Sequence, residues 1–230
     1  MYDRLSLEST GSATVRLLNA SWGNYLHRAL AQLKQVGRTH RVDGANLLIG
    51  RLKRTRPETY EHSLRVARLA HATGRVYGFD GARLKQLGQA AMLHDIGKIL
   101  VPESFLNRPR KLTRAEFFVL RLHPTFGALL LSYFNLSKEL CIRTQHHHER
   151  WDGNGYPNKL GGEEIPLMAR IVQVADTYDA MVVDRPYRQA STHDEAVTEL
   201  SRHRHKQFDA RMVEAFLDSF PAQATKHAGH

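Results

Sequence analysis

The most informative stretch of this chain reads His146-His147-His148-Glu149-Arg150-Trp151-Asp152-Gly153-Asn154-Gly155-Tyr156-Pro157. Its Gly/Asn/Pro-rich second half cannot continue a helix, so we expect an irregular loop of functional importance directly after a cluster of imidazoles. Further back lies a His94-Asp95 pair, followed one turn later by Lys98. Imidazole and carboxylate ligands together suit a divalent transition metal, and a lysine at this spacing can reach an anion bound to it. The pattern therefore predicts a metal-dependent phosphohydrolase.

Around these motifs the apolar residues recur at helical spacing almost throughout, and no alternating β-branched runs assemble a sheet. Pro57 is placed to begin a helix and Gly78 to end it, and Thr113 is placed to cap another. The residues between Pro102 and Arg110 are expected to form an extended loop. The expected helices cover residues 15–33, 45–52, 57–77, 83–93, 113 onward, 124–133, 137–147, 164–183, 192–203 and 209–218. The sequence therefore predicts an all-α fold.

Length and composition limit the classes of protein that fit. With 230 residues and 42% hydrophobic content, the chain can bury one full core with a small appendage. No apolar run of 18 residues occurs, and the beginning of the chain lacks the basic-then-apolar profile of a signal peptide. We therefore predict a cytoplasmic protein without a transmembrane segment.

The net charge of +10 is concentrated at the beginning, because residues 1–57 hold 10 Lys/Arg against 3 Asp/Glu. Such a segment can keep a protein soluble, or it can contact an acidic partner, a membrane surface or nucleic acid. No base-reading motif is present, so specific nucleic-acid recognition is not expected. The apolar stripe of residues 15–33 can pack on the domain's own core or on a partner, and we predict a homodimer through this helix.

The metal-ligand candidates are weak one by one and strong together. Glu58 and His62 lie four residues apart on one helix face, a spacing that most often decorates a surface. His94 and Asp95 are adjacent and diverge on a helix, so the carboxylate can bridge two metals more easily than both residues can bind one. A carboxylate on an apolar helix, such as Asp176, needs a metal or cation partner if it is buried. The remaining imidazoles that add to the set are His123, His147 and His148.

Read together, the motifs resemble the HD-GYP family, the cyclic di-GMP phosphodiesterase branch of the HD superfamily of metal-dependent phosphohydrolases. The resemblance extends over residues 58–220. It implies an HD-superfamily helical bundle at 56–222, preceded by a helical extension at 1–55 and followed by a tail at 223–230. The motifs that carry it are Glu58-xxx-His62, His94-Asp95-Ile96-Gly97-Lys98, His123-Pro124-xx-Gly127, His147-His148-Glu149-xx-Asp152-Gly153-x-Gly155-Tyr156-Pro157, Ala169-Arg170-Ile171-xx-Val174-Ala175-Asp176 and Arg185-Pro186-Tyr187-Arg188.

The resemblance also assigns roles residue by residue. It implies that Asp95 bridges two metals and acts in catalysis together with Lys98, and that Glu58 belongs to a third metal site. It places Gly155-Tyr156-Pro157 in a partner-docking loop. The implied substrate contacts are Lys98, Asp179, Arg185 and Arg188. The implied metal ligands are Glu58, His62, His94, Asp95, His123, His147, His148 and Asp176.

The predicted activity is hydrolysis of cyclic di-GMP to linear pGpG, to GMP or to both, by a metal-bridging hydroxide. Ligation by histidines and carboxylates favours two or three ions of Fe or Mn over Mg. Two alternatives stay open: a catalytically silent module that binds cyclic di-GMP or docks a partner, and a phosphodiesterase for another cyclic dinucleotide. The resemblance implies a signalling partner of the GGDEF type or another class.

Overall fold

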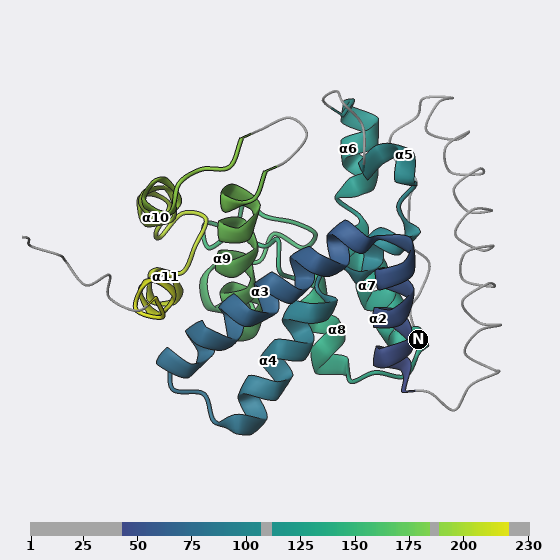
Figure 1. The fold of residues 1–230 in the computed structure, drawn as a ribbon, viewed down its shortest axis with the longest axis horizontal. Helices are drawn as coiled ribbons and strands as arrows, with labels where there is room; N and C mark the ends of the chain where they lie inside the picture. Colours follow the sequence, from purple (N-terminus) through teal and green to yellow (C-terminus); the bar gives the residue numbers. More distant parts are fainter. Residues whose placement is uncertain (1–42, 107–111, 185–188, 221–230) are drawn as a thin grey trace, which may run out of the picture. The chain divides into compact units, whose positions relative to one another are not determined.

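A computed structural model describes residues 43–106, 112–184 and 189–220, and within these residues the fold is all-α, as predicted (Figure 1). An isolated bridge between Arg204 and Phe208 is the β-type pairing found among them. The elements, in chain order, are α2 (Gly44–Thr55), α3 (Pro57–Val76), α4 (Gly81–Leu93), η1 (Ile96–Leu100), α5 (Glu103–Leu106), α6 (Arg114–Leu120), α7 (His123–Tyr133), α8 (Lys138–Gln145), η2 (Gly162–Glu164), α9 (Leu167–Val182), α10 (His193–Arg202) and α11 (Ala210–Leu217).

The chain divides into two compact units, Met1–Asp43 and Gly44–His230. The predicted helix at 15–33, and the dimer expected through it, lie outside the described residues. The domain boundaries inferred from the motifs, at residues 55 and 222, stay predictions. No helix in the described part of the chain is both long and apolar enough to cross a membrane.

Local sequence signals account for the helix ends. Pro57 occupies the first turn of α3, where its missing N–H removes no hydrogen bond. Gly78 follows that helix with a φ of +90°, a conformation that favours glycine. Thr113 caps α6 in a complete capping box with Glu116, as predicted. The expected extended loop after Pro102 is wrong over one stretch, because Glu103–Leu106 form the single turn α5, which starts with an acidic residue favoured near a helix N-terminus.

Helix α9 is the centre of the bundle, and its residues are buried or half-buried throughout. It packs against α3, α4, α10 and α11. The core around it brings together Val66 of α3, Leu87 of α4, Ile171 of α9 and Phe216 of α11. A helix that is apolar on several faces must be enclosed by neighbours, and burial of these side chains is the main stabilising contribution. The polar residues that α9 still carries are therefore held by specific partners.

Arg170 of α9 is one of these polar residues, and it pairs with Asp209. Its Nη1 donates to Asp209 Oδ2 at 2.6 Å, and both side chains are buried. Asp209 also caps α11 by accepting from the backbone N–H of Arg211 at 3.0 Å. Burial by itself raises the pKa of Asp209, but hydrogen bonds from Arg211 and Arg170 outweigh it and hold the pKa below its usual range.

We expect Asp209→Ala to lower the free energy of unfolding by about 3–5 kcal/mol, because it leaves the Arg170 charge buried and unpaired. Urea unfolding at neutral pH measures the loss, with Asp218→Ala at the exposed end of α11 as control. The low pKa of Asp209 means that the wild-type pair persists at neutral pH and is lost only as the pH falls through that depressed value. If the free energy of unfolding falls by less than about 1 kcal/mol, the loss is no larger than that of a helix N-cap alone. Such a result would contradict a stabilising Arg170–Asp209 pair.

Candidate metal centre and adjacent cavity

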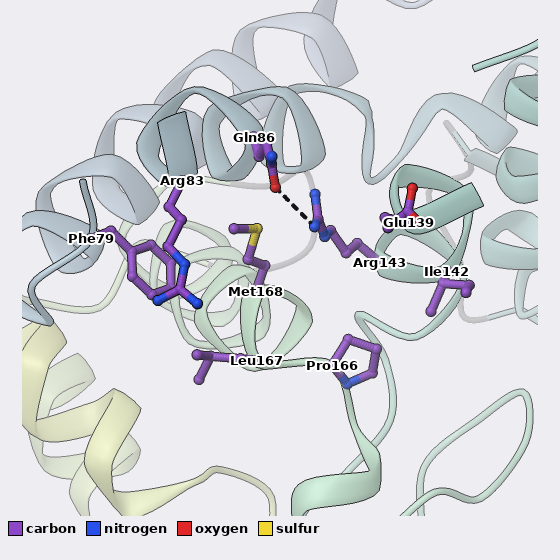
Figure 2. A pocket seen from close by; sticks show the side chains of 9 residues that line it. All are labelled: Phe79, Arg83, Gln86, Glu139, Ile142, Arg143, Pro166, Leu167 and Met168. Atoms are coloured by element: carbon purple, nitrogen blue, oxygen red, sulfur yellow. Dashed lines mark hydrogen bonds between the residues drawn. The ribbon is translucent and has the colours of Figure 1, made fainter. Parts of the chain in front are cut away.

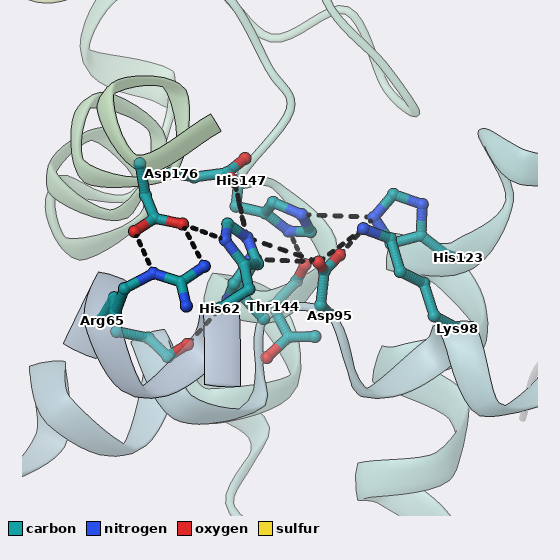
Figure 3. Close-up of polar contacts among 11 residues, drawn as sticks. His62, Arg65, Asp95, Lys98, His123, Thr144, His147 and Asp176 are labelled. Carbon is teal, nitrogen blue, oxygen red and sulfur yellow. Dashed lines mark hydrogen bonds and ion pairs between the residues drawn. The ribbon is translucent and has the colours of Figure 1, made fainter. Parts of the chain in front are cut away.

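Six helical segments bring the predicted ligands to one place. His62 comes from α3, and His94 and Asp95 come from the turn between α4 and η1. His123 begins α7, the His147-His148 pair follows α8, and Asp176 lies on α9. Figure 3 shows His62, His123 and His147 gathered around Asp95. The bundle therefore assembles residues that are more than 110 positions apart in the sequence.

Gly97 makes this assembly possible, because η1 and α7 touch through their backbones at this residue. A Cβ on Gly97 would lie 1.9 Å from His123 O and 2.5 Å from Gly127 N. Any side chain would separate the two segments, since backbone atoms cannot give way as a flexible side chain can. The contact places His123 Nε2 at 3.0 Å from Asp95 Oδ1.

Two groups of side chains have the geometry of metal sites, and they share Asp95. One group comprises Asp95, His123, His147 and His148, and the other comprises His62, His94 and Asp95. The ligand atoms within each group lie within 4.8 Å of one another. A shared carboxylate would suit a pair of neighbouring divalent ions, since Asp95 has two oxygens to offer. The described geometry therefore fits the bridging role predicted for Asp95.

The imidazoles are oriented by hydrogen bonds from their far nitrogens. Nδ1 of His94, His123 and His147 lies 2.7, 2.7 and 2.6 Å from the carbonyl oxygens of residues 91, 120 and 144. A carbonyl only accepts, so each Nδ1 carries a proton and each Nε2 is the nitrogen left for the cluster. His62 differs, because its Nδ1 bonds to the carboxylate of Asp179 at 2.6 Å. Such outer partners are what hold metal-ligating histidines in place.

The electrostatics of the site favour metal binding at neutral pH. Burial, together with the neighbouring imidazoles, lowers the pKa of His147 well below its usual range and that of His148 to about 3, so both are neutral. Burial by itself raises the pKa of Asp95, but Lys98, His94 and other partners outweigh it and hold the pKa well below its usual range. Neutral imidazoles and ionised carboxylates are the forms that bind metals.

His62 behaves in the opposite way. Burial lowers its pKa, but hydrogen bonds to Asp176 and Asp179 outweigh burial and raise the pKa to about 9. Without a metal His62 is thus protonated at neutral pH, with Nε2 3.0 Å from Asp176 Oδ1. A cation bound here takes the place of that proton, so metal binding should release it.

Two buried atoms test whether this donor set fits metal ions. Nε2 of His94 and Oδ1 of Asp95 are buried and make no hydrogen bond. Leaving such polar atoms without a partner in the interior costs about 1–3 kcal/mol each, and more for charged groups. His123 Nε2 lies 3.0 Å from Asp95 Oδ1 without forming a hydrogen bond to it. Both orphaned atoms belong to the metal-ligand groups, so a divalent cation bound there would satisfy them. The residues present therefore fit a resident metal.

Two of the predicted metal ligands, Asp176 and Glu58, stand outside the two groups. Asp176 is near them, with Oδ1 3.0 Å from His62 Nε2 and 3.9 Å from His94 Nε2. Glu58 is exposed on the first turn of α3, and its place in a third metal site stays a prediction. His146, the first member of the histidine triple, turns away and contacts Asn158.

The predicted substrate contacts have different outcomes. Lys98 Nζ lies 2.6 Å from Asp95 Oδ2 and remains partly exposed. Asp179 is buried, and its oxygens accept from His62 and from Arg65 Nε at 2.7 Å, so its predicted contact with a dinucleotide stays untested. Arg185 and Arg188 lie outside the described residues. Arg65 was not among the predicted residues, although its position three residues after His62 on α3 places it on the same helix face.

We expect Asp179→Asn to weaken metal binding by about 10- to 100-fold, because it removes the carboxylate that orients His62. Isothermal titration of the metal-free protein with Mn(II) measures the affinity. Asp194→Asn, on the exposed first turn of α10, is the matched control for loss of one negative charge. Equal affinity in the two variants would show that Asp179 does not support the site.

The loop after His148 is closed by Glu149, whose structural role the sequence did not reveal. Its side chain is fully buried and accepts from the backbone N–H groups of Asn158 at 2.6 Å and Leu160 at 3.1 Å. Its backbone carbonyl accepts from the Gln173 amide of α9. The sequence offered one signal for this role, a carboxylate directly before a Gly-rich stretch. If such a group is buried, it must accept hydrogen bonds from nearby backbone N–H groups.

The Gly155-Tyr156-Pro157 tripeptide lies against the metal-ligand cluster. A Cβ on Gly155 would come within 2.4 Å of Arg150 N, so the chain passes too close for any other residue. The Tyr156 ring stacks on His148 with centroids 4.9 Å apart. The described tripeptide thus shapes the site, and its partner-docking role stays a prediction.

A cavity of about 530 Å³ opens beside the ligands. Its wall includes His62, His148 and Asp176 of the cluster, and its cations are Lys98, Arg121 and Arg150. A second cavity of about 400 Å³ lies between α4, α8 and the start of α9, and none of its lining residues belongs to the metal-ligand groups (Figure 2). The first cavity therefore has both the volume and the charge to hold an anionic ligand against the metal centre.

Comparison with known proteins identifies the family of this chain. The model of the HD domain family matches residues 46–212. The cyclic di-GMP phosphodiesterase response regulator RpfG of Xanthomonas campestris is 43% identical over 158 residues, covering 65% of this chain and 41% of that protein. The 3'3'-cGAMP-specific phosphodiesterase 3 of Vibrio cholerae is 37% identical over 173 residues, covering 74% of this chain and 38% of that protein. The chain thus spans less than half the length of these relatives.

A solved structure confirms the fold. The HD domain of the L. monocytogenes phosphodiesterase PgpH, in complex with cyclic-di-AMP, aligns with a TM-score of 0.58 at 19% identity, covering 75% of this chain and 92% of that one. At this identity the likeness concerns the fold alone. Since the family model matches most of the chain and the helical bundle agrees, the chain belongs to the HD domain family, as its HD-GYP motifs predicted.

Proposed function

We propose that this chain hydrolyses the phosphodiester bonds of cyclic di-GMP, giving linear pGpG, GMP or both. The observation that carries the proposal is the pair of metal-ligand groups that share Asp95 at the wall of a cationic cavity. When bound, divalent ions supply an activated water and neutralise charge on the phosphoryl oxygens. The curated relative RpfG, named a cyclic di-GMP phosphodiesterase, supports the choice of substrate.

The chain's own residues prepare the site for an anion. Lys98 is tied to Asp95 through Nζ and is partly exposed to the cavity, so its remaining N–H groups can donate to a phosphoryl oxygen. The Tyr156 ring and Phe117 line the same cavity and offer surfaces for a nucleobase. His148 and Asp176 also line the cavity, so a phosphate bound there would lie beside the metal-ligand cluster.

The finer features of the cofactor and partners are part of the same proposal. Imidazole-rich ligation suits Fe or Mn, with two ions in the groups that share Asp95 and a third where Glu58 contributes. A GGDEF-type or other signalling partner would dock on the tripeptide loop, and the helix at 15–33 would form a homodimer. Metal analysis of Glu58→Gln against the wild type counts the third ion.

A second candidate, hydrolysis of a mixed GMP-AMP ring, is favoured by the similarity to the 3'3'-cGAMP-specific phosphodiesterase of V. cholerae. One experiment separates the two. The anaerobically purified protein, loaded with Fe(II) or Mn(II), is incubated with cyclic di-GMP or 3'3'-cGAMP, and products are resolved by chromatography. Faster conversion of cyclic di-GMP supports the first candidate, and faster conversion of the mixed ring supports the second. No conversion of either by fully loaded protein would instead identify a silent binding module.

A further inference from the structure

Arg121 differs from the other cations of the cavity because no carboxylate neutralises it. Lys98 pairs with Asp95 at 2.6 Å, and Arg150 pairs with Asp152 through Nη2 at 2.7 Å and Nε at 3.0 Å. Among the described residues Arg121 makes no ion pair, and its guanidinium lies over the Tyr156 ring at 4.3 Å from the centroid. A cation without an acidic partner in a cavity wall is available to an anionic ligand.

The fold fixes the position of this guanidinium. Arg121 directly follows α6 and stands two residues before the candidate ligand His123, so its backbone is held close to the metal-ligand cluster. The Tyr156 ring that carries it also stacks on His148. Tyr156 therefore contacts both a candidate metal ligand, His148, and the Arg121 guanidinium. Stacking orients the plane of the guanidinium and leaves its N–H edge free to donate.

A cyclic dinucleotide has a second phosphate that would not lie at the metal centre during cleavage of the first. A cyclic dinucleotide carries two phosphodiesters on opposite sides of its ring, and only one of them can occupy the Asp95 cluster at a time. The second phosphate keeps its negative charge and needs a partner in the cavity. A guanidinium is suited to this task, because two parallel N–H groups match two phosphate oxygens.

We propose that Arg121 binds the non-reacting phosphate of the cyclic dinucleotide and thereby selects substrates that have two phosphodiesters. This inference rests on the proposed phosphodiesterase activity. It assigns to Tyr156 the role of a positioning residue, which holds the guanidinium. Guanine recognition by the same side chain is the competing assignment, since arginine can also donate to O6 and N7 of guanine.

The test compares Arg121→Gln with wild type on cyclic di-GMP and on bis(p-nitrophenyl) phosphate, which has a single phosphodiester. In Arg121→Gln we expect the KM for cyclic di-GMP to rise by about 10-fold or more, beyond any rise in the KM for the small ester. The reason is that a hydrogen bond between a charged side chain and a phosphate is lost. The kcat should fall less than the KM rises. Arg121→Lys should restore part of the affinity, since lysine binds phosphate as a point charge. Arg114→Gln, exposed at the start of α6, controls for the change in net charge.

Cyclic di-AMP, used as an inhibitor of ester hydrolysis, separates phosphate from guanine recognition. Its inhibition constant should rise in Arg121→Gln by the same factor as the KM for cyclic di-GMP. An unchanged constant would assign Arg121 to guanine and overturn the proposal. If Arg121→Gln lowers kcat/KM equally for cyclic di-GMP and for the small ester, or for neither, the proposal is also overturned. The proposed function still stands in these cases, provided that the wild type cleaves cyclic di-GMP. If the wild type neither cleaves nor binds cyclic dinucleotides, both fail together.

Discussion

Asp95→Asn is expected to abolish phosphodiester hydrolysis, with a loss of at least about 1,000-fold, because this carboxylate belongs to both metal-ligand groups. An amide keeps one acceptor oxygen and has no negative charge, so it cannot bridge two cations. Both groups therefore lose a ligand through one substitution. Removing a residue that serves a single group, such as His147, would leave the other group with all its members.

Metal analysis and ester hydrolysis measure this effect together. The variant should retain fewer ions per chain than the wild type, and the wild type stripped by a chelator should lose its activity and regain it when Mn(II) is restored. Asp194→Asn serves as the charge-matched control on an exposed helix start. Full metal content with normal turnover in Asp95→Asn would refute the bridging role.

Gly97→Ala should be the most damaging conservative change in the fold. The added methyl group meets backbone atoms of α7, with 1.9 Å to His123 O, and backbone cannot rotate away. Overpacking usually costs about 1–3 kcal/mol and more where relief needs a backbone shift, so we expect a loss of at least 3 kcal/mol. The same shift separates Asp95 from His123, so metal affinity should fall with stability.

Gly88→Ala on α4 is the matched control, because a Cβ at Gly88 meets no atom within 4 Å. Alanine favours a helix over glycine by about 1 kcal/mol, so this variant should be slightly stabilised. Urea unfolding of the metal-free proteins reports stability without the contribution of ligand binding. Similar unfolding free energies for the two variants would contradict the close contact between η1 and α7.

The sequence predicted the helices well where local signals decide them. Pro57, Gly78 and Thr113 act through their own backbone geometry or side chain, so their effects are visible in a few neighbouring residues. The ligand types were equally visible, because histidines and aspartates on apolar helices need partners. The single turn α5 was missed, because a four-residue helix has too short a pattern to separate from a loop.

The relations between segments could not be read in the same way. The hydrogen bond from His62 to Asp179 joins residues 117 positions apart, and the stacking of Arg121 on Tyr156 depends on how a loop folds back. Spacing along the chain contains no information on such distances. The sequence therefore named the candidate ligands, while the orientation of His62 by Asp179 and the place of Arg121 required the fold.

The buried Glu149 carboxylate has a consequence for amide hydrogen exchange. The N–H groups of Asn158 and Leu160 both donate to this one side chain, so neither can exchange with solvent until the carboxylate is displaced from the interior. Their exchange rates should consequently be equal and slow, although Asn158 itself is exposed. The two amides thus form a natural probe that reports opening of the loop after His148 separately from unfolding of the surrounding helices.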